Sequence, residues 1–293
     1  MSNLKASIGT PLLVTRLTRG NLVLHAQPDF EAAAGDFWHK RIMQAEITDK
    51  LHQKQGRSIA RWTLPGLSLF LKRHYILPWR HGLGAILFPG SAWSPGLQEW
   101  HNLKWAEGQG LPVPRAVAAA EWRGPGLKLQ SFLAVEELAG MLPLHEAIPL
   151  AQQQLNATDF AAWKRRLVHE LARLSAELHR RHAFHKDLYL CHFYVAEEHC
   201  RNVPKTFRGA TVMIDFHRLG HHRLTGPWFQ VKDLAQLLYS TVKVPGVTNR
   251  DRLRFWKLYQ QRVNCGSWVK RAVLLKYRLY LRHARRVAAR KQG

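Results

Sequence analysis

Two aspartates occupy positions where an acid serves chemistry better than packing. Asp187 lies in the segment FHKDLYLCHF at residues 184–193, and Asp215 ends the apolar run TVMID at residues 211–215. A carboxylate that closes a buried strand is costly unless it has a partner. Carboxylates are also the groups that bind hard metal ions and move protons in enzymes. The two acids therefore predict a site that binds a metal ion or transfers a proton.

The hydrophobic pattern predicts the elements that must position these acids, beginning with strands in the N-terminal third. Leu64-Pro65-Gly66 is a turn signal between two β-type runs, and a helix is expected over Leu97–Gly108. Glycine and proline interrupt the uncharged stretch His81–Gln98, which is predicted to be a loop. Strands are expected at Ser58–Trp62, Leu67–Lys72, Arg115–Ala120 and Leu127–Glu136.

From Asp159 onward the pattern is mainly that of helices. Apolar residues recur at steps of three and four from Phe160 to Leu178, and Thr158 or Asp159 is expected to cap this helix. The chain is predicted to be helical again from Lys232 to its end. A β-rich part followed by a helix-rich part predicts an α+β fold with two unequal lobes that meet near residue 138. Between the helices, β-type runs are expected at Phe193–Val195 and Thr211–Asp215.

The segments around both acids resemble loops of protein kinases. The run HKD at residues 185–187 matches the first three positions of the catalytic loop H-R-D-x-x-x-x-N, and His192 stands where the Asn is expected. Asp215 and Phe216 match two letters of the metal-binding loop D-F-G, with His217 in place of the Gly.

Both departures from ordinary protein kinases are shared with the lipopolysaccharide kinase (Kdo/WaaP) family. Residues 185–193 are similar to its H-x-D-x-Y-x-C-H-F loop, and residues 214–218 to its I-D-L/F-H-R segment. Lys232-Asp233-Leu234 resembles the K-D-L helix that follows. The resemblance covers roughly residues 50–260, and the long match over the loop makes it specific.

The resemblance implies a bilobal protein-kinase-like fold. A β-rich, ATP-binding N-terminal lobe is expected over residues 1–138. A helical lobe with the catalytic loop and a basic C-terminal helix is expected over residues 139–293. Asp187 would accept the proton of the attacking hydroxyl, while Asp215, with His192 as a second ligand, would bind Mg²⁺.

For the N-terminal lobe, the resemblance implies an ATP site. Lys72 lies on a β-type run where the family places its phosphate-binding Lys, and Glu99 is expected to orient it, with Glu107 as a less favoured alternative. Gly56, within Gln55-Gly56-Arg57, is the candidate for the turn that covers the phosphates. The hinge whose backbone would hydrogen-bond adenine is expected at Glu136, Glu137 and Leu138.

Each of these residues has an ordinary structural alternative. Lys72 and Glu99 could be solvated charges, and His192 could be a hydrogen-bonded core histidine. Asp233 is expected to brace the catalytic loop rather than to react. Zinc binding by Cys191-His192 or His199-Cys200 is disfavoured, because neither pair has the usual ligand spacing. The kinase interpretation is favoured because five features occur in kinase order: Lys72, Glu99, Glu137, Asp187 and Asp215.

The charge of the chain predicts a polyanionic partner. The 44 Lys and Arg exceed the 20 Asp and Glu, which gives a net charge of +24. Nine of these cations lie between Trp268 and Gly293, a segment with no acid and interleaved apolar residues. Such a basic amphipathic helix indicates an anionic membrane surface or a phosphorylated ligand, with plain solvation as the alternative. No nucleic-acid-binding motif is present, so nucleic acid is not expected as a partner.

The residue chemistry predicts phosphate transfer to a hydroxyl, and the resemblance implies an ATP-dependent kinase that phosphorylates a heptose or Kdo hydroxyl of the lipopolysaccharide core precursor. The alternatives are a protein or small-molecule kinase of the same fold and a pseudokinase that binds anionic ligands without turnover. Three cysteines, no signal-peptide pattern and no long apolar run predict a protein on the cytoplasmic side. The basic C-terminal segment and the acceptor that the resemblance implies predict a peripheral location at the inner face of the inner membrane.

Overall fold

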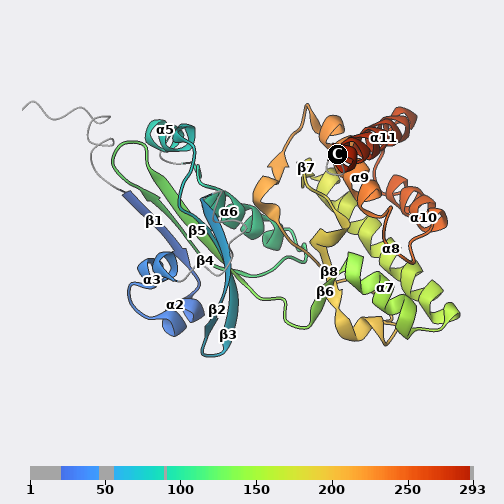
Figure 1. Cartoon of the computed structure of the whole chain (residues 1–293), viewed down its shortest axis with the longest axis horizontal. Coiled ribbons are helices and arrows are strands. Elements are labelled where there is room, and N and C mark those ends of the chain that lie inside the picture. The colour runs from blue at the N-terminus through green and yellow to red at the C-terminus, as the bar shows by residue number, and fades with distance from the viewer. Residues whose placement is uncertain (1–20, 46–55, 89–90, 291–293) are drawn as a thin grey trace, which may run out of the picture. The chain divides into compact units, whose positions relative to one another are not determined.

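The computed structural model describes residues 21–45, 56–88 and 91–290, which form two compact units (Figure 1). Unit 1 contains the described residues up to Trp105 together with Arg115–Glu137. Unit 2 contains Ala106–Pro114 and the described residues from Leu138 onward. Unit 1 is built on a five-stranded sheet and unit 2 is mainly helical, so the predicted α+β class is confirmed.

The sheet of unit 1 is antiparallel throughout, in the strand order β1-β4-β5-β3-β2. The predicted hairpin joins β2 and β3, and Leu64 pairs with Leu67 across its turn. An additional strand, β1, pairs with β4 along its whole length. The strands are β1 (Asn21–Ala26), β2 (Arg57–Leu64), β3 (Leu67–His74), β4 (Ala116–Arg123) and β5 (Leu129–Glu136).

The two faces of this sheet have different partners. Helices α2 (Pro28–Ala34) and α3 (Trp38–Gln44) pack on one face, where Phe30 and Ile42 are buried against Leu71 of β3. Burial of each such side chain stabilises the fold by about 1.5–3 kcal/mol. Since side chains alternate along a strand, Lys72 points to the opposite face, where it meets helix α6 (Pro95–Gly108).

The predicted loop over His81–Gln98 is wrong in part, because helix α5 (Trp79–Leu87) lies there and α6 begins at Pro95. The glycines of α5 do not break the helix, because they allow other segments to pack closely against it. A Cβ on Gly82 would lie 1.9 Å from the carbonyl oxygen of Leu127, so only glycine allows this approach. Proline is also well suited to the first residue of a helix, where no N–H partner is needed. Residues 89–90 lie outside the described residues.

Unit 2 combines short strands with long helices. The strands form a three-stranded sheet β6-β8-β9 and a two-stranded pair β10-β7. They are β6 (Met141–Pro143), β7 (Ala183–Phe184), β8 (Phe193–Ala196), β9 (Thr211–Met213) and β10 (Gly220–His221). The helices are α7 (Leu144–Gln154), α8 (Ala157–Arg180), α9 (Gly226–Ser240), α10 (Asn249–Gln260) and α11 (Ser267–Arg290).

The cap of α8 differs from the expectation. Asn156, rather than Thr158 or Asp159, is the N-cap, and its side chain accepts a hydrogen bond from the backbone N–H of Asp159. Asp159 sits at the third helical position, where its carboxylate accepts from the Asn156 amide at 2.8 Å. The helix therefore begins earlier than the apolar repeat suggests. Its first turn is polar, so the spacing of apolar residues does not reveal it.

Helices α8 to α11 form the core of unit 2. Tyr259 of α10 is fully buried, and its hydroxyl contacts His179 Nδ1 at 2.6 Å and Gln230 Nε2 at 2.7 Å. A mostly apolar cavity of about 160 Å³ lies among the same four helices. In the described part of the chain, no helix is both long and apolar enough to cross a bilayer.

Candidate active site

A buried carboxylate of α9 holds the loop that carries Asp187. Asp233 Oδ2 accepts a hydrogen bond from the backbone N–H of His185 at 2.8 Å and lies 3.4 Å from His179 Nε2. Asp233 is fully buried, and a buried carboxylate is costly unless hydrogen-bonded. The expected bracing role of Asp233 matches this geometry, because a shift of the loop would break the hydrogen bond from the His185 backbone to this buried carboxylate.

His185 connects this loop to the segment that carries Asp215. Its Nε2 lies 3.0 Å from the carbonyl oxygen of Ile214, and its ring packs edge-on against Phe216. Since a carbonyl can only accept, Nε2 carries the hydrogen. Burial lowers the pKa of His185, so the ring is neutral. Within unit 2, the two segments that carry the acids are thus joined through one buried imidazole.

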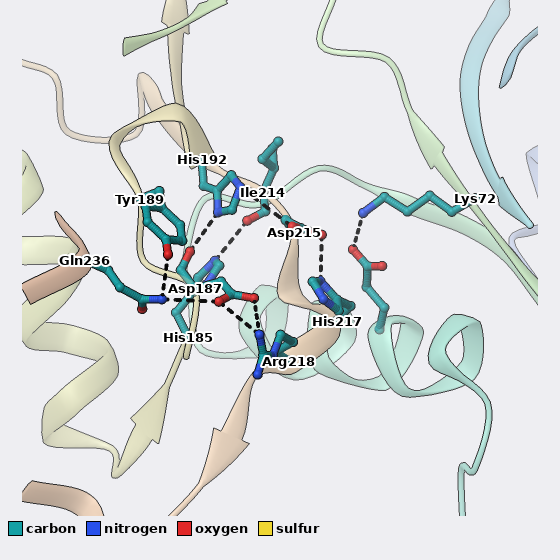
Figure 2. A network of polar contacts seen from close by, with 11 residues as sticks. Lys72, His185, Asp187, Tyr189, His192, Ile214, Asp215, His217, Arg218 and Gln236 are labelled. Atoms are coloured by element: carbon teal, nitrogen blue, oxygen red, sulfur yellow. Dashed lines mark hydrogen bonds and ion pairs between the residues drawn. The ribbon is translucent and has the colours of Figure 1, made fainter. Parts of the chain in front are cut away.

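Asp187 is held by two side chains that sequence reasoning did not assign to the site (Figure 2). Arg218 Nη1 lies 3.2 Å from Oδ1 and 3.1 Å from Oδ2 of Asp187, and Gln236 Nε2 lies 3.3 Å from Oδ1. Gln236 Nε2 also donates to the Tyr189 hydroxyl at 3.0 Å. The Asp187 side chain remains 16% exposed, so its carboxylate is oriented yet accessible. The only sequence signal for Arg218 was its place in the segment IDFHR at residues 214–218.

Asp215 adopts a left-handed backbone conformation, with φ 67° and ψ 53°. This conformation is unfavourable for most residues, but Asp tolerates it better than most. Its Oδ1 lies 2.8 Å from His217 Nδ1, and its Oδ2 lies 3.7 Å from His192 Nε2. His217, which replaces the usual glycine, therefore contacts the carboxylate directly.

The donors around Asp215 suit a hard cation in part. His192 Nδ1 donates to the carbonyl oxygen of Asp187 at 2.8 Å, and His192 Nε2 faces the Asp215 carboxylate at 3.7 Å. Mg²⁺ is usually bound by one or two carboxylates together with phosphate oxygens, so Asp215 fits and the imidazole is a weaker match. Among the described residues, no group of three or more His, Cys, Asp or Glu is arranged to hold a metal ion.

Lys72 and Glu99 form an ion pair in unit 1, with 2.6 Å between Lys72 Nζ and Glu99 Oε1 (Figure 2). The Glu99 side chain is only 5% exposed. A carboxylate buried to this degree requires a cation or several hydrogen bonds. The pairing is set by the tertiary fold, since β3 supplies the lysine and α6 supplies the acid.

The expected hinge residues make several contacts of their own. Glu137 pairs with Arg61 at 2.8 Å, and its backbone N–H donates to Ser68. The backbone N–H of Glu136 donates to Arg115. The N–H of Leu138, by contrast, has no hydrogen-bond partner in the described part of the chain.

The turn at Gly56 is explained by packing. Gly56 has φ 67°, and its carbonyl accepts from the N–H groups of Tyr75 and Ile76. A Cβ at this position would lie 2.7 Å from Ile76 Cβ. Gln55, the other half of the expected phosphate-covering turn, lies outside the described residues.

The His199-Cys200 pair takes part in the packing of unit 2. The backbone carbonyl of His199 accepts from Trp163 Nε1 at 2.7 Å. Burial raises the pKa of Cys200 to about 11, which keeps this thiol protonated at neutral pH.

Comparisons with known proteins agree on one family. The sequence model of the lipopolysaccharide kinase (Kdo/WaaP) family matches residues 94–259, more than half of the chain. The chain is 29% identical to the lipopolysaccharide core heptose(I) kinase WaaP of Pseudomonas aeruginosa over 71% of this chain and 75% of that protein. It is 26% identical to the enzyme of that name from Escherichia coli, over 76% of this chain and 80% of that protein.

A solved structure extends the similarity to the fold. The structure of WaaP in complex with acyl carrier protein matches 88% of this chain and 99% of the WaaP chain. The TM-score is 0.62 and the sequence identity is 26%. The predicted protein-kinase-like fold is thereby confirmed.

The Lys72–Glu99 pair yields a test that needs no substrate. Lys72→Met should lower the free energy of unfolding by about 2–4 kcal/mol, because Glu99 would stay buried without its cation. Adding Glu99→Gln should recover most of this loss, since a neutral amide is less costly to bury than a charge. Chemical denaturation measures both effects, with Lys128→Met as the control at an exposed lysine. Equal losses in the single and the double variant would contradict the buried pair.

Proposed function

The chain belongs to the lipopolysaccharide kinase (Kdo/WaaP) family, and on this premise we propose that it transfers the γ-phosphoryl group of ATP to a sugar hydroxyl of the lipopolysaccharide inner core. The observation that carries the proposal is the arrangement in unit 2, where Asp233 and His185 fix the segments of Asp187 and Asp215. The curated relatives are heptose(I) kinases, which favours heptose over Kdo as the acceptor.

Asp187 is the proposed general base. The acceptor oxygen attacks the γ-phosphorus while the bond from that phosphorus to the β,γ-bridging oxygen breaks and ADP leaves. The hydroxyl proton passes to a carboxylate oxygen of Asp187. Gln236 orients this carboxylate through the 3.3 Å hydrogen bond. Since the transition state of phosphoryl transfer is loose, the main contributions of the protein are positioning and electrostatic stabilisation.

We assign the nucleotide to residues that the sequence analysis predicts for it. Lys72 would bind ATP phosphates as a point charge, and Glu99 would hold it in position. The Leu138 N–H is the proposed donor to adenine, because the N–H groups of Glu136 and Glu137 are already used. Asp215 and His192 would hold Mg²⁺, which would neutralise charge on the transferred phosphate.

The molecule that receives the phosphate distinguishes the alternative functions. A protein or small-molecule kinase would phosphorylate acceptors without core sugars, and a pseudokinase would bind nucleotide without turnover. A scaffold has no need of Lys72, Asp187 and Asp215 together, which disfavours the pseudokinase.

We also propose that the protein acts at the cytoplasmic face of the inner membrane, with α11 on the anionic surface. Trp268, Leu275 and Leu279 are spaced for one helix face, and they are 53%, 61% and 47% exposed. Exposed arginines flank this face at Arg271, Arg278, Arg282, Arg285 and Arg286. Apolar insertion beside cationic side chains is typical of helices that lie in the membrane interface.

Asp187→Asn tests the proposed function directly. The variant should reduce phosphate transfer from ATP to core oligosaccharide by roughly 10²–10⁴, the range for loss of a positioned base. Radiolabelled ATP and mass spectrometry of the oligosaccharide measure the transfer, and Asp36→Asn is the exposed control. Activity within a few-fold of the wild type would remove Asp187 from the mechanism, and no transfer by the wild type would refute the function.

Asp215→Asn tests the metal assignment. The amide keeps the side-chain shape and tolerates the left-handed backbone, but it lacks the charge that a hard cation prefers. Binding of a non-hydrolysable ATP analogue should therefore lose most of its dependence on Mg²⁺ in titration calorimetry. Glu198→Gln, at a side chain that is 77% exposed, is the control. Unchanged affinity in Mg²⁺ would count against the assignment.

Sedimentation with vesicles tests the membrane surface. The protein should sediment with vesicles that contain anionic lipid at low salt and be released at high salt, because salt screens exposed charges. Replacing Arg278, Arg282, Arg285 and Arg286 with Gln should weaken sedimentation but spare ATP binding. Wild-type protein that stays in the supernatant at low salt would refute this part of the proposal.

A further inference from the structure

The surroundings of Asp187 carry more positive than negative charge. Lys186, Arg218, Lys232 and Lys276 form a cationic cluster in unit 2, and the carboxylates acting on it are Asp187 and Asp233. Burial lowers the pKa of Lys186 and of Lys232, and neighbouring cations lower both further. Four cations against two acids leave an excess of two positive charges.

The two acids are already used by other groups. Asp233 accepts from the backbone of His185, and Asp187 is bound by Arg218. Lys232 Nζ donates to the carbonyl oxygen of Lys186. The Lys186 ammonium packs 5.7 Å from the Phe229 ring centre and has no hydrogen-bond acceptor in the described part of the chain. This half-buried ammonium can therefore donate hydrogen bonds to a ligand.

A buried nitrogen without a partner lies beside this ammonium. A Cβ on Gly220 would lie 2.6 Å from Lys186 Nζ and 2.8 Å from His222 Nε2, so both nitrogens converge over Gly220. The His222 ring stacks on Phe229 with 4.0 Å between ring centres. Its Nε2 is buried and has no hydrogen-bond partner among the described residues.

The strand pair fixes this arrangement next to the catalytic loop. Gly220 of β10 pairs with Phe184 of β7, three residues before Asp187. The absence of a side chain at Gly220 leaves room for the two nitrogens, and any other residue would displace the flexible end of Lys186 or the His222 ring. Lys186, whose ammonium interacts electrostatically with the Asp187 carboxylate, thus converges with the unpartnered His222 Nε2 over this strand pair.

We propose that Lys186 and His222, with Arg218, bind an anionic group on the same acceptor molecule whose hydroxyl meets Asp187. This inference rests on the proposed function, since it takes Asp187 as the base. The group is a carboxylate of an acidic sugar or a phosphate already present on the acceptor, because both offer oxygens that accept from ammonium and guanidinium groups. An anion would also give Arg218 a second acceptor. One oxygen of Asp187 would then be open to the hydroxyl of the acceptor molecule.

Three forms of one acceptor test this site. Deacylated core oligosaccharide is used intact, after reduction of its carboxylates, and after phosphatase treatment, and binding is measured by calorimetry without nucleotide. The wild type should bind one of the treated forms about tenfold more weakly than the intact form, as expected for loss of one charged hydrogen bond. The weaker form identifies the source of the anion.

Lys186→Gln locates the effect. The variant should bind the intact form about tenfold more weakly than the wild type does, and it should bind the intact and the treated form equally. Lys186→Arg should retain most of the wild type's discrimination between the two forms. Lys257→Gln, which removes the same charge from an exposed position on α10, should behave as the wild type. In turnover with ATP, Lys186→Gln should raise KM for the acceptor far more than it lowers kcat.

The outcomes separate this inference from the proposed function. Equal affinity of the wild type for all three forms, no binding of any form, or discrimination retained in Lys186→Gln would overturn the anion site. Phosphate transfer to all three forms with the same KM would refute the anion site but support the kinase. Discrimination in binding without any transfer would support the site and refute the kinase.

Discussion

The buried carboxylate of Asp233 is the interaction on which the geometry of unit 2 depends. A fully buried acid must find donors, and Asp233 takes one from the backbone of the loop before Asp187. Because this bond is made to the backbone, it fixes the loop whatever side chains the loop carries. His185 then transmits the fixed position to the carbonyl of Ile214, and so to the turn at Asp215. One buried charge on α9 thereby places both acids of the proposed site.

The charged and polar side chains in each unit differ in whether they have a partner of opposite charge. Asp187 is neutralised by Arg218, and Glu99 by Lys72, so these acids have their cations in place. The buried Nε2 of His222 has no hydrogen-bond partner among the described residues, and Lys186 Nζ lies over the Phe229 ring. Buried polar groups of folded proteins seldom lack a partner, so the His222 nitrogen is a candidate for contact with a ligand. The excess of positive charge in the sequence is therefore concentrated in part beside the proposed base.

Several features could be predicted from the sequence because they depend on local pattern. The hairpin of β2 and β3 followed from two β-type runs around Leu64-Pro65-Gly66, and α8 followed from its apolar period. The kinase family followed from a loop motif of many matched positions. Helix α5 was missed because Gly82 and Gly84 count as helix breakers in sequence, whereas their value here is close contact with Leu127 and Trp93. Propensity cannot register a contact between segments far apart in the chain.

The sequence by itself determined the types of residue available for chemistry and their order along the chain: Lys72, Glu99, Asp187 and Asp215. It also determined the excess of basic residues, since composition needs no coordinates. Only the tertiary structure decided that Arg218 and Gln236 hold Asp187, and that Lys186 and His222 converge over Gly220. These contacts join residues separated by up to 49 positions. Such partners are chosen by the packing of helices and strands, and no local pattern encodes which of 44 cations will meet a given acid.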